Sequence, residues 1–184
     1  MSEASPRDPW KRCFIALAPD AVSRDALAAF DVPPNARRVP YEQLHLTVAF
    51  IGALPALACE TLARGLQDHA VPIPPAPVTT IECWPGRTHP RLVVAVLAMS
   101  DAFIALDWRV RSLMFAAGLP LDARAFRPHV TLARFARDTA FATLAGDTPM
   151  PPPLRFTSLV LYSSTLARQG ARYDALASVV LDRS

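Results

Sequence analysis

Two five-residue stretches, Leu44–Val48 (LHLTV) and Pro128–Leu132 (PHVTL), decide the fold of this chain. Each holds a histidine, one apolar residue and a threonine, with further apolar residues on either side. In an extended strand alternate side chains share a face, so His45 and Thr47 point one way while the apolar residues around them point into a core. The second stretch, around His129, has the same pattern. The sequence therefore predicts two equivalent strands, each half buried.

The two His-x-Thr pairs also indicate a chemistry. If both strands border one cleft, the fold supplies two imidazoles for proton transfer and two hydroxyls for hydrogen bonds to an anion, a combination that suits attack on a phosphodiester. A lone strand histidine is more often a half-buried packing residue. The chain has only 4 histidines, however, and two matched pairs favour a functional site. The candidate catalytic residues are His45, Thr47, His129 and Thr131.

Composition indicates one well-packed folded unit. The chain has 184 residues, of which 52% are hydrophobic and 19% charged, and this suits one domain or two small lobes that share a core. Its longest apolar runs, such as residues 92–99, are too short to span a bilayer, and residues 1–6 lack the basic and apolar parts of a leader. We therefore expect a cytoplasmic protein, a monomer, with a flexible N-terminus over residues 1–11.

Neither the cysteines nor the remaining histidines indicate a metal or redox site. Cys13, Cys59 and Cys83 are an odd number at wide spacing, which is typical of reduced cysteines without a special role. His69 and His89 form no metal-ligand spacing with cysteines or carboxylates. We expect no metal and no cofactor.

Arginine carries nearly all of the positive charge, because Lys11 is the only lysine. A guanidinium group binds phosphate through two parallel hydrogen bonds, although a compositional bias explains the arginine count equally well. The net charge of +3 is too small for a long nucleic-acid footprint, so an RNA end or a short oligonucleotide is the expected partner. The candidate contacts are Arg37, Arg38, Arg87, Arg91, Arg124, Arg127, Arg134, Arg137, Arg168 and Arg172.

Extended and helical patterns alternate along the chain and are separated by segments rich in proline and glycine. Hairpin-like strand pairs favour an α+β arrangement with antiparallel pairing. The two motif histidines lie 84 residues apart, nearly half the chain, which predicts two similar lobes that face each other. Strands are expected at 12–18, 44–51, 78–84, 92–97, 129–135, 156–164 and 172–181, helices at 21–30, 56–70, 100–117 and 139–144, proline-rich connectors at 71–77 and 149–153, and a turn at 169–170.

The chain resembles the two-histidine (2H) phosphoesterase superfamily, specifically the LigT-like RNA 2′,3′-cyclic phosphodiesterases, also called 2′-5′ RNA ligases. One His-x-Thr is a weak signal, whereas two copies at this spacing are specific. Gln43 stands where the family more often has asparagine, and the loop 84–91, expected to help hold the base or ribose, matches only in outline. The resemblance runs nearly end to end, through residues 12–17, 43–52 (QLHLTVAFIG), 125–134 (AFRPHVTLAR), 161–164 and 172–173.

The resemblance implies an α+β bilobal fold over residues 1–184. Two pseudo-symmetric lobes with mainly antiparallel sheets would surround a central cleft, with helices outside. It also implies the activity of an RNA 2′,3′-cyclic 3′-phosphodiesterase, a metal-independent hydrolase that opens the cyclic phosphate to a 2′-phosphomonoester, with reversible 2′-5′ RNA ligation. The partners would be RNA with 2′,3′-cyclic phosphate ends, such as tRNA fragments, or small cyclic nucleotides.

The same resemblance assigns roles to the motif residues. His45 would be the general acid and His129 the general base, and their near-symmetry lets the roles reverse for ligation. Thr47 and Thr131 would donate hydrogen bonds to the non-bridging oxygens of the phosphate. Their alternative role is simply to suit a strand.

Arg134 and Phe50 are the substrate-binding candidates. Arg134 would clamp the phosphate, with a solvated surface arginine as the alternative. Phe50 would stack on a base, with a core aromatic residue as the alternative. Three other functions stay open: a 2H phosphodiesterase acting on 2′-5′ oligonucleotides or nucleotide-sugar cyclic phosphates, a non-catalytic RNA-end or nucleotide-binding protein, and a structural α+β protein in which the motifs are accidental.

Overall fold

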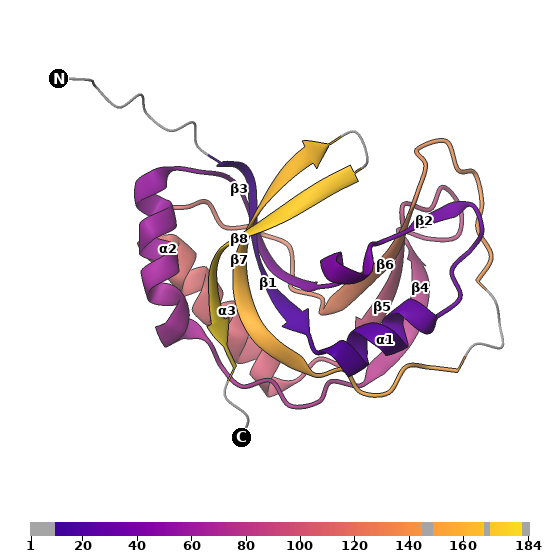
Figure 1. The fold of residues 1–184 in the computed structure, drawn as a ribbon, viewed down its shortest axis with the longest axis horizontal. Coiled ribbons are helices and arrows are strands. Elements are labelled where there is room, and N and C mark those ends of the chain that lie inside the picture. The colour runs from indigo at the N-terminus through magenta and orange to yellow at the C-terminus, as the bar shows by residue number, and fades with distance from the viewer. Residues whose placement is uncertain (1–9, 145–148, 168–169, 182–184) are drawn as a thin grey trace.

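The computed structural model describes residues 10–144, 149–167 and 170–181 (Figure 1). In these ranges the strands form one eight-stranded antiparallel sheet in the order β4-β5-β6-β3-β1-β7-β8, and β2 pairs with β6. The strands are β1 (Trp10–Pro19), β2 (Ala36–Arg38), β3 (Leu46–Leu54), β4 (Val78–Trp84), β5 (Leu92–Leu97), β6 (His129–Phe135), β7 (Phe156–Ala167) and β8 (Gly170–Val180). The helices are α1 (Ala21–Ala29), α2 (Ala56–His69) and α3 (Asp101–Ala116), with a 3-10 turn η1 (Tyr41–Gln43).

The sheet consists of two halves that meet at one place (Figure 1). One half contains β2, β4, β5 and β6, and the other contains β1, β3, β7 and β8. Between the halves the register pairs Leu46 of β3 with Val130 of β6, and both side chains are fully buried. The expected α+β fold of two lobes with antiparallel pairing is confirmed, and the lobes share one sheet through this junction.

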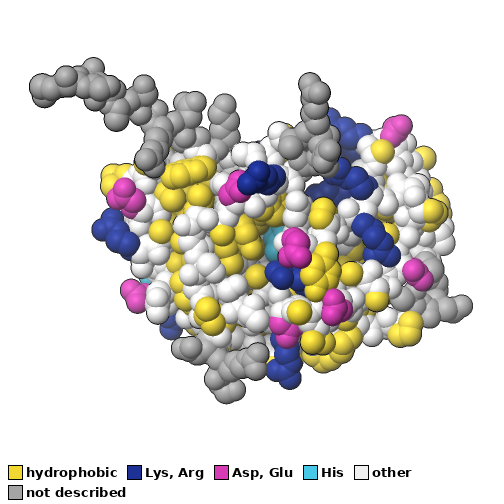
Figure 2. Space-filling view, in the orientation of Figure 1, with side chains coloured by type: hydrophobic (Ala, Val, Ile, Leu, Met, Phe, Trp, Pro, Cys, Tyr) yellow, Lys and Arg dark blue, Asp and Glu magenta, His cyan; other side chains and the backbone are white. Residues whose placement is uncertain are grey.

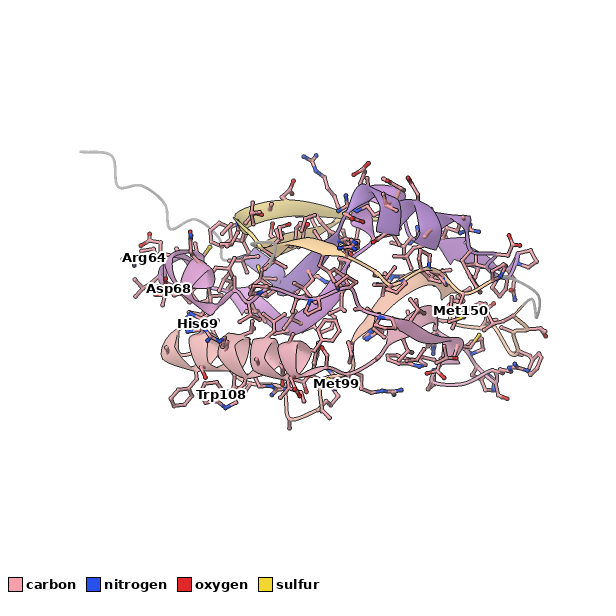
Figure 3. The ribbon with its side chains drawn as sticks, turned by 90° about the horizontal axis from the view of Figure 1, so that it is seen from below. Arg64, Asp68, His69, Met99, Trp108 and Met150 are labelled. Atoms are coloured by element: carbon pink, nitrogen blue, oxygen red, sulfur yellow. The ribbon has the colours of Figure 1, made fainter. Side chains whose placement is uncertain are left out.

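Helices cover the outside of both halves. α2 and α3 pack against each other, α2 against β7 and β8, and α3 against β3, while α1 lies beside the half that contains β4 and β5 (Figures 1 and 3). Gly65 of α2 faces Leu113 so closely that a Cβ atom there would collide with the leucine side chain. Figure 3 shows His69 between the two helices and Trp108 on the outer side of α3. The buried stripe of α3 is the one expected from helical spacing: Phe103, Leu106, Val110, Leu113 and Met114.

Side-chain caps begin α1 and α3, and a glycine follows α3. The Asp20 carboxylate accepts a hydrogen bond from the main-chain N–H of Ser23 at 2.7 Å, and the Ser100 hydroxyl accepts one from that of Phe103 at 3.3 Å. These caps satisfy N–H groups that have no partner within the helix. After α3, Gly118 adopts a left-handed φ of 70°, which costs glycine little. The expected helices at both places are confirmed.

The expected helix at 139–144 is wrong. The main chain of this segment pairs instead with the loop between β4 and β5. The N–H of His89 donates to the carbonyl of Ala140 at 2.8 Å, and the N–H of Ala142 donates to that of Arg87 at 3.0 Å. A tertiary partner therefore takes the hydrogen-bonding groups that a short helix would have used.

The start of the first motif strand also differs from the expectation. It begins at Leu46 rather than at residue 44, because the preceding residues form η1, and the N–H of Leu44 donates to the carbonyl of Tyr41 at 3.2 Å. The three-residue strand β2 was not predicted, since it pairs along its length with β6 and has no periodicity of its own.

Some expectations lie outside the described residues. These are residues 1–9 of the expected flexible N-terminus, residue 169 of the expected turn, and the candidate contact Arg168. Residues 10 and 11 belong to β1. No helix in the described ranges is both long and apolar enough to cross a membrane.

The junction between the halves predicts a strong effect of one truncation. Leu46 is fully buried and Leu57 of α2 is 74% exposed. We expect Leu46→Ala to lower the free energy of unfolding by about 2 to 5 kcal/mol, because it removes transfer energy and leaves a cavity. The matched variant Leu57→Ala should change it by no more than about 0.5 kcal/mol. Urea unfolding followed by circular dichroism measures both; similar values would contradict the central position of Leu46.

Candidate functional site

The junction arranges the two His-x-Thr pairs around itself. Because Leu46 is paired with Val130 in antiparallel register, the residue before one lies across from the residue after the other. His45 therefore lies across from Thr131, and Thr47 lies across from His129. The two histidines occupy one diagonal of this group and the two threonines the other. The apolar junction side chains point to the opposite face, into the core.

His45 is surrounded by aromatic rings from the neighbouring strands. The ring centroids of Phe14, Tyr173 and Tyr162 lie 4.9, 5.4 and 6.5 Å from that of its imidazole. This burial lowers the pKa of His45 to about 4. The hydrogen bond to the Gln43 carbonyl opposes the shift, and the positive charges of Arg134 and of His129 add to it.

His129 has different neighbours. Its ring centroid lies 4.4 Å from that of Trp84, and the guanidinium carbon of Arg127 lies 4.3 Å from the centre of the Trp84 ring. Burial lowers the pKa of His129, the hydrogen bond to the Arg127 carbonyl raises it, and the guanidinium charge of Arg127 lowers it. Both histidines are therefore mainly neutral near pH 7 in the free protein.

The two imidazoles have the same tautomer. Nδ1 of His45 lies 2.6 Å from the carbonyl oxygen of Gln43, and Nδ1 of His129 lies 2.7 Å from that of Arg127. A carbonyl oxygen only accepts hydrogen bonds, so both Nδ1 atoms carry the proton. The lone pair is then on Nε2, which in His45 accepts from the Thr47 hydroxyl at 3.1 Å. Each Nε2 is the atom that can exchange a proton with a substrate.

Two cavities of different size lie on either side of the junction. The larger, about 320 Å³, contains Thr47, Phe50 and His129. The smaller, about 40 Å³, contains His45 and Thr131. The first has the size of a small-molecule site and the second does not. The four motif side chains are thus divided between the cavities as the register predicts.

The structure also places the two substrate-binding candidates. Arg134 is exposed and lines the smaller cavity with His45 and Thr131. Phe50 is 61% exposed, lines the larger cavity and lies 6.3 Å from Phe14 between ring centroids. Phe50 is therefore not a core residue, and its ring is available for stacking.

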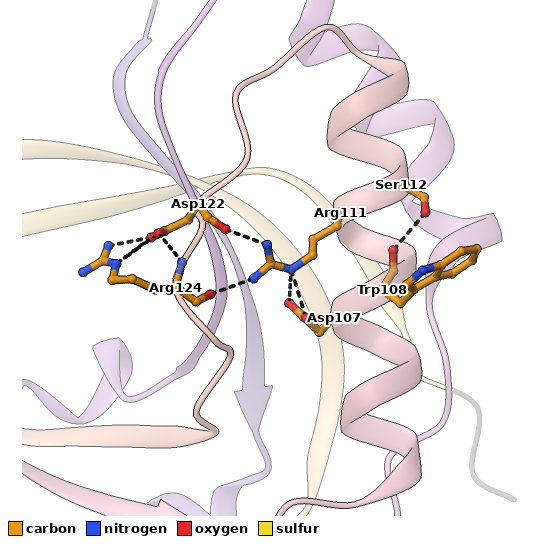
Figure 4. A network of polar contacts seen from close by, with 6 residues as sticks. All are labelled: Asp107, Trp108, Arg111, Ser112, Asp122 and Arg124. Carbon is orange, nitrogen blue, oxygen red and sulfur yellow. Dashed lines mark hydrogen bonds and ion pairs between the residues drawn. The ribbon is translucent and has the colours of Figure 1, made fainter.

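A polar network holds the far wall of the larger cavity (Figure 4). Arg111 of α3 donates to the carboxylate of Asp107 at 2.9 Å and to the main-chain carbonyls of Asp122 and Arg124 at 2.6 and 3.0 Å. These bonds attach the segment after α3 to the helix. The segment leads directly to Arg127 and His129, so the network positions one side of the site.

Sequence reasoning missed the roles of Trp84 and Arg127. Arg127 was one of ten candidate arginines, and Trp84 was noted only in a loop that matched in outline. The pairing of β4 with β5 and of β5 with β6 brings Trp84 to His129, and Arg127 precedes His129 in the chain and lies over the Trp84 ring. The position of Arg127 two residues before a motif histidine was the one local signal.

Figure 2 shows a histidine side chain near the middle of the face, with basic side chains close beside it. Among the described residues, no group of three or more His, Cys, Asp or Glu side chains has a geometry that could hold a metal ion.

Comparison with known proteins gives consistent similarities. A family model described as the 2′-5′ RNA ligase superfamily matches residues 18–165. The chain is 29% identical over 181 residues to an RNA 2′,3′-cyclic phosphodiesterase of Escherichia coli K12, covering 90% of this chain and 94% of that one. It is 28% identical over 179 residues to a protein of the same name from Geobacillus stearothermophilus, covering 89% of this chain. This chain spans about half, 54%, of that relative.

Solved structures show the same similarity. The crystal structure of E. coli LigT complexed with 3′-AMP superposes with a TM-score of 0.75 at 27% identity, covering 96% of this chain and all of that one. A crystal structure of a protein from Thermus thermophilus gives a TM-score of 0.70 at 25% identity, covering 92% of this chain and 97% of that one.

The burial and hydrogen bonds of the imidazoles predict their behaviour in solution. At pH 7 both rings should be the neutral Nδ1–H tautomer, and His45 should stay mainly neutral down to about pH 4, because burial opposes its charge. Two-dimensional ¹H–¹⁵N imidazole spectra recorded from pH 4 to 8 measure both properties, with His45→Gln to assign the signals. A proton on Nε2, or protonation of His45 above pH 6.5, would contradict the structure.

Proposed function

The chain belongs to the 2′-5′ RNA ligase superfamily, and from that premise we propose that it hydrolyses the 2′,3′-cyclic phosphate at an RNA end to a 2′-phosphomonoester. Its relatives from E. coli and G. stearothermophilus are named for this activity. The observation that carries the proposal is the diagonal arrangement of His45 and His129 around the Leu46–Val130 pair. The reaction requires two titratable groups on opposite sides of the reacting phosphorus, whereas binding alone does not require them.

The reaction needs a base and an acid on opposite sides of phosphorus. Nε2 of His129 takes a proton from a water molecule while the water oxygen bonds to phosphorus. The bond from phosphorus to the 3′ oxygen breaks, and Nε2 of His45 gives its proton to that oxygen. The products are a 2′-phosphomonoester and a 3′-hydroxyl.

His45 must be protonated to act as the acid, although its pKa in the free protein is about 4. A bound phosphodiester carries a negative charge, and an opposite charge within about 4 to 6 Å favours the imidazolium. We therefore propose that His45 takes up its proton when the substrate binds. The same phosphate competes for the Thr47 hydroxyl, which in the free protein donates to His45.

The threonines and Arg134 would stabilise the charge that develops on the non-bridging oxygens. Thr47 and Thr131 lie on the second diagonal, from which each hydroxyl donates to one oxygen; donors in such positions contribute roughly 2.7 to 4 kcal/mol. Arg134, in the cavity with Thr131, supplies two parallel hydrogen bonds to phosphate. Phe50 stacks on the terminal base in the larger cavity.

We further propose that residues 1–184 act as one two-lobed domain, as a monomer and in the cytoplasm. Both lobes contribute to the site, so a single chain supplies all four motif residues. The three cysteines are free and buried, which agrees with a reducing compartment. RNA ends such as those of tRNA fragments, or small cyclic nucleotides, are the proposed substrates, with 2′-5′ ligation as the reverse reaction.

Removal of either imidazole tests the acid-base scheme. We expect His45→Ala and His129→Ala each to lower kcat by about 10²-fold or more, since each removes one proton-transfer group. The assay uses an RNA oligonucleotide that ends in a 2′,3′-cyclic phosphate, with EDTA present, and the product is identified by mass and phosphatase sensitivity. His69→Ala on α2 is the control and should retain full activity.

Three results would decide against the scheme. They are turnover retained by either folded variant, a strict requirement for metal, or a 3′-phosphate product. Binding of the oligonucleotide without turnover by the unmodified protein would favour the non-catalytic RNA-end-binding alternative.

The lowered pKa values predict the pH dependence. kcat/KM reports the free protein, in which burial lowers both imidazole pKa values below 6.5. We expect a bell-shaped kcat/KM profile with its maximum below pH 6.5, falling about tenfold per pH unit well above both pKa values because the acid loses its proton. The kcat profile should lie at higher pH, since bound phosphate raises the pKa of His45. A kcat/KM that rises from pH 6.5 to 8 would contradict this assignment.

A further inference from the structure

We infer that a second, arginine-lined groove beside β4 binds the RNA chain on the 5′ side of the terminal nucleotide. This inference rests on the proposed function and narrows its substrate class. An enzyme with such a groove acts on oligonucleotide ends in preference to mononucleotide cyclic phosphates. We call this feature the upstream groove; its polar lining includes Thr80, Glu82, Trp84, Arg87, Arg91 and Arg127.

The upstream groove adjoins the candidate site. Its volume is about 810 Å³, against about 320 Å³ for the cavity that contains His129. Trp84 and Arg127 line both. A chain that leaves the His129 cavity past these two residues therefore enters the upstream groove directly.

The groove has a net positive charge. Its lining includes Arg87, Arg91 and Arg127, all exposed, and one acidic side chain, Glu82. The Glu82 carboxylate accepts a hydrogen bond from the Trp84 indole at 2.6 Å and lies 3.7 Å from a guanidinium nitrogen of Arg127. Arg91 donates one N–H to the neutral main-chain carbonyl of Arg137 at 3.2 Å, so its charge is not compensated there. The charges of Arg87 and Arg91 therefore face the groove, and a phosphodiester backbone is the anion that matches a row of guanidinium groups.

The arginines are carried on a braced main chain. The N–H of Arg91 donates to the carbonyl of Trp84 at 2.7 Å, and the N–H of Phe135 donates to the carbonyl of Arg91 at 2.9 Å. The N–H of Ala142 donates to the carbonyl of Arg87 at 3.0 Å. Because the backbone is already ordered, little conformational entropy is lost when RNA binds.

The opposite side of the junction does not provide a similar path. The cavity there is about 40 Å³, too small for a nucleotide. Arg38, one of its basic residues, donates to the carbonyls of Ala28 and Phe30 at 3.0 and 2.6 Å and so holds α1. With the cyclic phosphate at the histidines and the terminal base in the larger cavity, the 5′ oxygen leaves toward Arg127. The next phosphate meets Arg127, and those further upstream meet Arg87 and Arg91.

The test compares two substrates on one double variant, Arg87→Ala with Arg91→Ala. One substrate is 2′,3′-cyclic AMP, which has no upstream nucleotide to place in the groove when its phosphate is at the histidines. The other is a hexaribonucleotide that ends in a 2′,3′-cyclic phosphate. We expect kcat/KM for the hexanucleotide to fall about tenfold. A plot of log kcat/KM against log salt concentration should also become shallower by about 1.4, because each of the two lost phosphate contacts contributes about 0.7 to the slope. kcat/KM for 2′,3′-cyclic AMP should stay within about twofold of that of the unmodified protein.

The matched control is Arg64→Ala, which removes an exposed arginine of α2 that lies 3.9 Å from Glu60. Arg64→Ala should leave kcat/KM for both substrates unchanged. If the double variant fails to fold, each single variant replaces it, and Arg87→Glu should give the larger loss. An equal fall in kcat/KM for both substrates, or no change for the hexanucleotide, would overturn the proposed role of the upstream groove.

Failure of the proposed function has a different signature. In that case the unmodified protein hydrolyses neither substrate. Fluorescence anisotropy then tests the groove by itself, with a labelled hexanucleotide that ends in a 3′-phosphate. Weaker binding by the double variant than by Arg64→Ala supports the upstream groove, and equal binding overturns it.

Discussion

The single main-chain pairing between Leu46 and Val130 is the constraint on which the site depends. It joins the two halves of the sheet, and its apolar side chains point into the core. Because strand side chains alternate, the residues on either side of each must point to the other face. A slip of one residue would turn the histidines into the core and the apolar residues outward. Burial of two hydrocarbon side chains thus holds four polar ones in place.

The same packing that positions the imidazoles also changes their chemistry. The rings of Phe14, Tyr162 and Tyr173 exclude water from His45, which lowers its pKa, while the main-chain carbonyl two residues before each histidine holds the proton on Nδ1. The free protein therefore has two neutral imidazoles with Nε2 as the reactive nitrogen. In the proposed reaction, the charge of a bound phosphate would allow one of them to become an acid.

The two lobes are related by pseudo-symmetry, but the cavities beside their histidines differ in volume. The cavity beside His129 is about eight times the volume of the one beside His45, at about 320 and 40 Å³. Arg111 holds the segment after α3 that lines the larger cavity, and Trp84 and Arg127 line both this cavity and the upstream groove. In the proposed reaction, a symmetric pair of proton-transfer groups would therefore serve a substrate that lies in one direction only.

By itself, the sequence determined the strands, the long helices and the four motif residues, because alternation, capping and helical spacing are local and do not need the fold to be known. It did not reveal β2, the true conformation of residues 139–144 or the surroundings of the histidines. Trp84 reaches His129, and Tyr173 reaches His45, only through strands that are far apart in the chain. Desolvation, cavity size and the direction of a bound chain depend on what lies next to a residue in space, and only the tertiary structure decides that.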